Sequence, residues 1–525
     1  MEMDMSLSLA SHTEDKPLNF KMKLGGALVI IAFVVLFIGL FNQFYNPYLF
    51  GIFILLTSSG SILYTKGLYA DQTDGVKNNG IMFQSLTNRG LWAWSLGIVL
   101  TLFYVILYWY PQYLGFNKEG NTGLVRFFDP LSYMLNGRQA SQWFVYGTFY
   151  TLAILLMGIK FIQKHRHSKY QVIRTISVMF FQTAFAFLIP EFLERLNGDT
   201  AYFSKDIKSI WPLNIYFTDQ WNIDGMLKGG NLGAFMLVMG IAMLFIVTPI
   251  LTYFYGKRWY CSWVCGCGAL AETAGDPFRQ LSDKSVKAWK IERWLVHAIL
   301  AWVTILTIAV LYTMFYDNPT TYWLNKNSFS TLVIVLFLIL SVLLLLKRKT
   351  LFKDFDKKGY IIALTIIAVT ILCIVHILTS NGRNVFFIEA ATLRQWYGFL
   401  IASVFSGVIG VGFYPIMGSR VWCRFGCPLA AILGLQQKFF SRFRITTNGS
   451  QCISCGNCST YCEMGIDVRA YAQKGQDIVR SSCVGCGICS NVCPRGVLKL
   501  ENGPMKTRKL EGPIQYVNGL FEVNN

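Results

Sequence analysis

Charged residues are scarce in this chain of 525 residues. Asp, Glu, Lys and Arg make up only 14% of it, whereas hydrophobic residues make up 54% and the mean hydropathy is +0.42. A water-soluble chain of this length carries more charge, so the composition excludes a soluble globular protein. Acidic residues are scarcer than basic ones, 28 against 47. Because the basic residues are dispersed around apolar runs rather than gathered on one segment, no nucleic-acid partner is expected.

Two further features are absent: a pair of histidines placed to bind haem, and a cleavable signal peptide. Histidine is rare, with five residues, and a bis-histidine haem needs two at similar depth in the membrane. His297 and His376 fall near opposite ends of their apolar runs, so no haem is predicted. The first 20 residues, which mix both charges, lack the apolar core of a cleavable signal peptide. The first apolar run is therefore expected to remain in the protein.

Long apolar runs are what the sequence has in abundance. A helix needs roughly 20 largely apolar residues to cross the hydrocarbon core of a bilayer. The sequence predicts ten such spans, at 24–41, 48–65, 91–110, 141–162, 172–190, 231–255, 292–316, 329–346, 360–379 and 395–417. The fold class is therefore an all-α polytopic membrane protein. A leader at 1–23 precedes the transmembrane helical domain at 24–417.

The distribution of Lys and Arg predicts the orientation. The densest basic clusters lie at 164–170, 256–290 and 347–358, which fall on one side if successive spans alternate. Basic loops stay on the cytoplasmic side, so both termini are predicted to be cytoplasmic and the protein to lie in the inner membrane. Fourteen cysteines in a reducing compartment favour metal ligation over disulfides.

Eight cysteines near the carboxyl end form two runs, "CISCGNCSTYC" from 452 and "CVGCGICSNVC" from 483. Both read C-x2-C-x2-C-x3-C, the spacing by which bacterial ferredoxins hold [4Fe–4S] clusters, with the fourth cysteine serving the other cluster. The predicted ligands are Cys452, Cys455, Cys458 and Cys493 for one cluster, and Cys483, Cys486, Cys489 and Cys462 for the second. This predicts a small α+β two-cluster module at 441–500, followed by a tail at 501–525.

Two details qualify this assignment. Pro494 follows the second run as in the usual pattern, whereas Glu463 stands in the corresponding place after the first run. The competing interpretation is a pair of zinc sites. Zinc sites with four cysteines normally join two C-x2-C pairs across a longer loop, so the two runs fit zinc poorly.

A second cysteine pattern is duplicated after the sixth and tenth spans. "GKRWYCSWVCGCGALAE" (256–272) aligns with "GSRVWCRFGCPLAAILG" (418–434), which belongs to a membrane-edge motif and connecting helix at 418–440. Cysteines four apart are expected on one face of a helix, and two such pairs offer the four thiolates of one cluster or metal ion. The predicted further redox centre consists of Cys261, Cys265, Cys423 and Cys427.

Three points about this pattern stay open or secondary. The neighbouring Arg258, Arg420 and Arg424 are expected to favour thiolate over thiol. Cys267 has no counterpart in the second copy, so it is either a further ligand or without a role. The alternative to a redox centre is that these cysteines are small apolar packing residues.

Paired C-x3-C segments at membrane ends, followed by a two-cluster ferredoxin module, resemble the membrane polyferredoxins of the NosR/NapH type. The resemblance covers roughly 230–300 and 400–500. It implies a protein linked to the quinone pool that supplies electrons towards nitrate or nitrous oxide reduction. The chain departs from that family at Gly266, which follows Cys265 where a proline is usual. It also lacks a periplasmic flavin-binding domain before the spans.

The sequence therefore predicts a membrane-bound iron–sulfur electron carrier, or a subunit of a quinol dehydrogenase, rather than a stand-alone enzyme. Its expected partners are membrane lipid, the quinone pool and other redox proteins, and no residue is expected to be catalytic. The alternative function is an accessory protein for metalloenzyme maturation or regulation, as in related CcoG/FixG-type proteins. A transporter with an iron–sulfur sensor is disfavoured, because few charged residues fall at mid-membrane.

Overall fold

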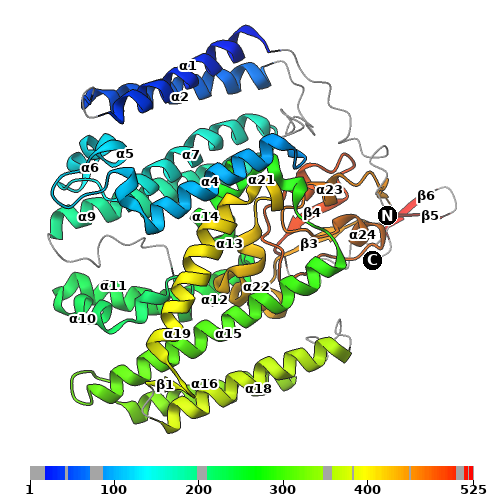
Figure 1. The fold of residues 1–525 in the computed structure, drawn as a ribbon. Coiled ribbons are helices and arrows are strands. Elements are labelled where there is room, and N and C mark those ends of the chain that lie inside the picture. The colour runs from blue at the N-terminus through cyan, green and yellow to red at the C-terminus, as the bar shows by residue number, and fades with distance from the viewer. Residues whose placement is uncertain are drawn as a thin grey trace.

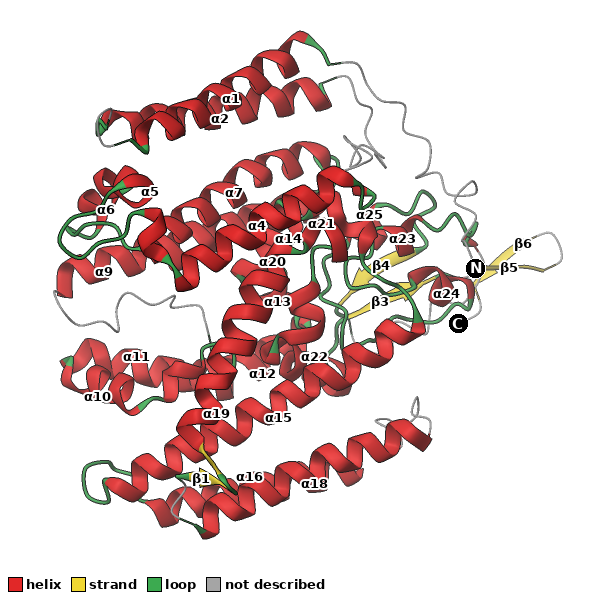
Figure 2. Cartoon of the chain, viewed as in Figure 1, coloured by secondary structure: helices red, strands yellow, loops and turns green. Residues whose placement is uncertain are grey.

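The computed structural model describes residues 18–41, 45–70, 87–197, 210–346, 357–380, 383–448, 451–503, 514–517 and 520–523. Residues 1–17 of the expected leader and most of the expected tail lie outside the described residues. The described chain is mostly helical, with three short two-stranded sheets (Figures 1 and 2). The expected fold class, a polytopic helical membrane protein, is confirmed.

All ten expected spans are present as helices that are long and apolar enough to cross a membrane. Seven are single helices: α1 (Phe20–Gly39), α2 (Tyr48–Tyr69), α4 (Leu91–Trp109), α7 (Gln142–Lys164), α15 (Val286–Asp317), α16 (Lys326–Leu346) and α18 (Lys357–Thr379). The other three are interrupted by π-helical turns: α8–η3–α9 (Lys169–Phe180, Phe181–Leu188, Ile189–Asn197), α11–η5–α12 (Gly230–Ala242, Met243–Val247, Thr248–Tyr255) and α19–η7–α20 (Ala390–Tyr397, Gly398–Ile409, Gly410–Gly412).

The helix starts follow from local sequence. The side chains of Asn19, Ser141 and Ser285 each accept a hydrogen bond from the backbone N–H three residues on, which satisfies one of the free donors of a first helical turn. π-helical turns are rare and frequently mark functional sites. The two spans that lead into the duplicated cysteine motif both contain one.

The outer surface of the spans is apolar. On α1, for example, Ile30, Phe33 and Phe37 are 66%, 57% and 62% exposed. Apolar side chains exposed along a whole helix suit contact with lipid, because the hydrocarbon core solvates them as well as a protein interior does. Together with the span lengths, this shows a multi-pass membrane protein.

Short elements connect the spans. At one end of the bundle lie η2 (Pro111–Leu114), α5 (Gly123–Phe127), α6 (Asp129–Leu135), η4 (Ile215–Thr218), α10 (Gln220–Lys228) and the hairpin β1–β2 (Asn384–Val385, Ile388–Glu389). The opposite end holds α13 (Arg258–Cys261), α14 (Gly266–Thr273), η6 (Asp276–Leu281), α21 (Tyr414–Met417), η8 (Trp422–Gly426) and α22 (Pro428–Phe440). This second group contains both copies of the duplicated motif.

The ferredoxin-like module sits against that second group (Figure 1). Its sheet pairs β3 (Arg444–Thr447) antiparallel with β4 (Leu498–Glu501), with Arg444 opposite Glu501. Three short helices complete it: α23 (Asn457–Thr460), α24 (Val468–Gln473) and α25 (Ile488–Asn491). After the module, β5 (Ile514–Val517) and β6 (Leu520–Val523) form a hairpin within the expected tail.

Candidate iron–sulfur centres

The eight cysteines of the module gather around two separate cavities. One is lined by Cys452, Cys455, Cys458 and Cys493, and is called the first tail site. The other is lined by Cys462, Cys483, Cys486 and Cys489, and is called the second tail site. Both cavities are small and of similar size, about 20 Å³ each. The structure therefore groups the cysteines as the crossed ferredoxin pattern predicts, and each set of four thiols suits the ligation of one cubane cluster.

Backbone amides point at several of these sulfurs. Ile466 N–H donates to Cys462 Sγ at 3.4 Å, and the N–H of Gly485 donates to the thiol of Cys483. Such N–H···S bonds are one control on the potential of a cluster. Burial raises the pKa of the Cys483 thiol to about 11, so cluster assembly there would displace a proton.

The second tail site faces the membrane domain. Tyr170 Oη donates to Gly485 O, Gln171 Nε2 to Cys486 O, and Ser262 Oγ to Val484 O, each at 2.9 Å. The first tail site lies further out, where Cys452 and Cys455 are partly exposed and Ile453 is 52% exposed. The two sites thus differ in their neighbours, since the second contacts the membrane domain. Both contain partly exposed cysteines: Cys452, Cys455 and Cys493 in the first, and Cys462 and Cys486 in the second.

The two copies of the membrane-edge motif share a backbone hydrogen bond and the place of the second cysteine. Cys265 N–H donates to Tyr260 O at 2.8 Å, and Cys427 N–H donates to Trp422 O at 2.9 Å, five residues back in both copies. Cys265 and Cys427 are the N-caps of α14 and α22, with extended backbone. The expectation that each pair lies on one helix face is wrong, because a helix ends between the two cysteines of each pair. In the second copy Pro428 disfavours helical backbone at Cys427.

A glycine begins each copy and is required there. Gly256 and Gly418 end the preceding helices with φ of 67° and 94° and ψ of −176° and 170°. Only glycine adopts this backbone conformation readily. The two matched glycines therefore turn the chain in the same way from each span into each cysteine pair.

The two pairs converge. Cys261, Cys265, Cys423 and Cys427 are buried in one apolar cluster together with cysteines of both tail sites. Burial raises the pKa of the Cys261 and Cys427 thiols, and nearby thiols of the opposite pair raise it further: Cys423 for Cys261, and Cys261 and Cys265 for Cys427. The Cys267 thiol is hydrogen-bonded to the Cys265 side chain and lies near the thiols of Cys423 and Cys427. The structure brings five thiols together here, which we call the membrane-edge site.

The arginines of the motif differ in what they contact. Arg420 Nη1 lies 3.6 Å from Cys423 Sγ and donates to Cys261 O at 3.3 Å. Burial raises the pKa of the Cys423 thiol, and Arg420 opposes that shift. The other two differ from expectation: Arg258 stacks on Phe443 at 4.6 Å, and Arg424 Nε pairs with Glu292 at 2.6 Å. Of the three, Arg420 is the one that bonds a thiol of the site.

Arg420 also anchors a buried ion-pair network between the module and the membrane domain. It pairs with Glu272 of α14, and its Nε lies 3.0 Å from Glu463 Oε1 of the module. Glu272 pairs in turn with Arg174 of α8, and Glu463 with Arg279 of η6 at 2.8 Å. Every side chain in this network is at most 2% exposed. Although burial disfavours its charge, Arg279 and Arg420 hold the pKa of Glu463 below its usual value.

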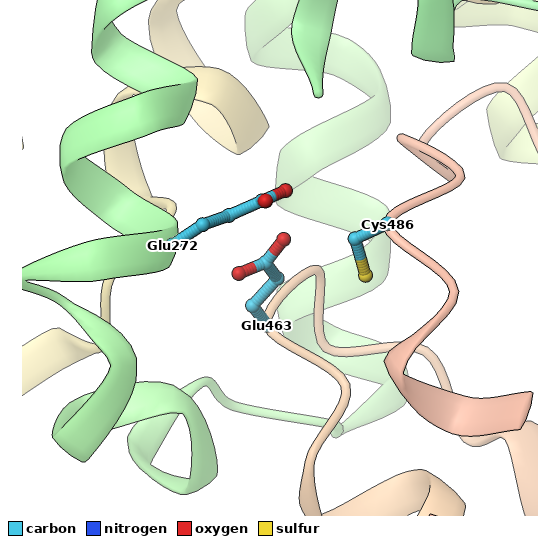
Figure 3. Close-up of side chains that lie close together, drawn as sticks. All are labelled: Glu272, Glu463 and Cys486. Carbon is cyan, nitrogen blue, oxygen red and sulfur yellow. The ribbon is translucent and has the colours of Figure 1, made fainter. Parts of the chain in front are cut away.

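Glu272, Glu463 and Cys486 come within 4.8 Å of one another through their ligand atoms (Figure 3). A cation is poorly suited to this place, because three guanidinium groups already neutralise the two carboxylates. The sequence did not identify this network. Its one signal was Glu463 in place of the usual proline, since a carboxylate next to a cluster ligand needs a buried partner.

Comparisons with known proteins agree with this geometry. A family model described as "4Fe-4S binding domain" matches twice, at residues 237–285 and 398–446. The two matches cover the two copies of the membrane-edge motif. A model described as "4Fe-4S dicluster domain" matches residues 423–498, which include all eight cysteines of the tail sites.

A curated relative is "Putative electron transport protein YccM" of Escherichia coli, 26% identical over 232 residues. The match covers 44% of this chain and 48% of the relative, so it spans about half the length of each. No solved structure matches the chain. The chain is therefore a multi-pass membrane protein with 4Fe-4S binding domains.

The buried network yields a stability prediction. Glu463→Gln removes the negative charge that Arg279 and Arg420 share, so two buried cations lose a partner. Breaking a buried ion pair in this way typically lowers the free energy of unfolding by ~3–5 kcal/mol. We expect a lower thermal unfolding midpoint for the protein in detergent, measured by scanning calorimetry. Asp317→Asn is the control, because it breaks the exposed pair with Arg383 and should cost only about 0–1 kcal/mol. Equal midpoints for the two variants would contradict a stabilising network.

Proposed function

We propose that the protein holds three [4Fe–4S] centres in series and exchanges electrons between the membrane quinone pool and other redox proteins. The observation that carries this proposal is the convergence of Cys261, Cys265, Cys423 and Cys427 beside the second tail site, within one apolar cluster. Each of the three sets contributes cysteines to this cluster, which suits transfer of electrons between them rather than separate tasks.

The proposed roles of the residues follow from their contacts. Four thiols would ligate each centre, and Cys267 would be a spare thiol near the third. A bound [4Fe–4S] cluster takes up and releases one electron without any change of protein ligand. Arg420 would balance negative charge at Cys423, and the surrounding apolar side chains would exclude water.

The proposed direction of access follows from exposure. The partly exposed cysteines of the first tail site would face a soluble redox partner, whereas the membrane-edge site would serve the quinone side. A respiratory or nitrogen-oxide reductase system is the proposed destination. Both termini and the module would be cytoplasmic, in the inner membrane, because the basic clusters lie on their side of the spans.

The number of centres is tested by metal analysis of the full-length protein purified without oxygen. We expect about twelve irons and twelve acid-labile sulfides per chain, four of each for each of three clusters. Cys423→Ser combined with Cys427→Ser should lower both counts to about eight and leave the tail sites loaded. Cys373→Ser, in an apolar cluster of α15, α16 and α18, is the control and should keep the wild-type counts.

Quinol oxidation separates this proposal from a maturation role. When a quinol analogue is added to membranes that contain the wild-type protein, the visible absorbance should show that the clusters are reduced. Membranes that contain the Cys423/Cys427 double variant should show no such change. About eight irons in both proteins would reject the third centre. About twelve irons per chain, in clusters that quinol does not reduce, would reject only the assignment of quinone as a partner.

Orientation is tested separately by reporter fusions. Alkaline phosphatase fused after residue 120 should be active, because that loop is predicted to be outside, and a fusion after residue 284 should be inactive. The reverse pattern would place the cysteine sites in the wrong compartment for this function.

A further inference from the structure

A cavity of about 510 Å³ lies beside the cysteine sites and belongs to none of them. Its walls come from the start of α15, from α22 and from residues 476–482 of the module. Cys423 forms part of one wall. A cavity of this size is typical of a site for a small molecule.

The charge around the cavity is strongly positive. Five cationic side chains line it against two carboxylates, an excess of three positive charges: Lys257, Arg293, Arg424, Lys438 and Arg480, against Glu292 and Asp477. Side chains of one sign that line a cleft raise the local concentration of ligands of the opposite sign.

Two of these cations are held against one ring. The guanidinium of Arg293 lies 4.6 Å from the centre of the Trp289 ring, and that of Arg480 lies 5.0 Å from it. Arg480 forms no ion pair among the described residues. Both guanidinium groups line the cavity, and an anion bound there would offset their positive charge.

Two more cations are buried without full compensation. Arg424 uses Nε for Glu292 and Nη1 for Asp283 O, each at 2.6 Å, while its buried Nη2 has no hydrogen-bond partner. Lys257 is 1% exposed and donates to Ser481 O at 2.6 Å, and none of the described carboxylates lies within ion-pair distance of it. A buried donor without an acceptor, or a buried charge without a counter-charge, costs free energy. These two side chains therefore favour binding of an added anionic acceptor.

We propose that this cavity binds a phosphate-bearing anion. Phosphate carries up to two negative charges and accepts several hydrogen bonds, and arginine forks match its oxygens. The cavity lies at the inner end of α15, so the phosphate can belong to a lipid headgroup or to a soluble phosphate ester. Its charge would act on the membrane-edge site, because Cys423 lines the same cavity.

Pyrophosphate is the soluble probe. The full-length protein in phosphatidylcholine nanodiscs should bind it in a calorimetric titration. Arg293→Gln with Arg480→Gln should weaken binding roughly tenfold or more, because two charge-assisted contacts are lost. Lys287→Gln with Lys290→Gln is the matched control, since both lysines are exposed on the same first turns of α15 and neither lines the cavity. Iron content checks that each variant is folded.

Lipid is the second probe. Nanodiscs containing phosphatidylglycerol are compared with phosphatidylcholine discs, and lipid retained by the protein is measured by native mass spectrometry. Loss of retained phosphatidylglycerol in the Arg293/Arg480 variant alone supports a headgroup as the occupant, and tight pyrophosphate binding alone supports a soluble one. The proposal is overturned if the wild-type protein binds neither probe, or if the Arg293/Arg480 variant binds as well as the wild type.

Discussion

Burial of charge between the module and the membrane domain is the constraint on which the cysteine sites depend. Arg420 pairs with Glu272 on the membrane side and with Glu463 on the module side, and it also lies against Cys423. Each of these charges is stable in an apolar interior only because its partners are in place. The relative position of the second tail site and the membrane-edge site is therefore fixed by ion pairs rather than by loose surface contact.

The parallel duplication explains how two distant segments form one site. Each copy follows a glycine with positive φ, ends a short helix before its second cysteine and starts a new helix after that cysteine. The same backbone hydrogen bond recurs in both copies, from the second cysteine to the aromatic residue five positions back. The two copies, which lie in one buried cluster, therefore each supply two thiols to the membrane-edge site.

Sequence reasoning recovered the parts of the molecule that depend on local pattern. The ten spans follow from apolar run length. Ferredoxin spacing predicts which tail cysteines share a cluster, and each predicted set of four lines one cavity. The helix breaks at Cys265 and Cys427 were missed, because a spacing of four is read as helical unless the backbone is known. The network of Arg174, Glu272, Arg279 and Glu463 was missed because its members are up to 289 residues apart and charge type alone does not identify partners.

The carboxylate of Glu463 has a consequence for how the module works. A soluble ferredoxin meets its partners by diffusion, so its rate of exchange depends on concentration and on salt. Here the module is covalently joined to the membrane domain and held by buried ion pairs that salt screens little. The proposed electron exchange between the module and the membrane domain would therefore be a first-order event, insensitive to protein concentration and little affected by ionic strength. A ferredoxin with proline at this position lacks the carboxylate that Arg279 and Arg420 hold here.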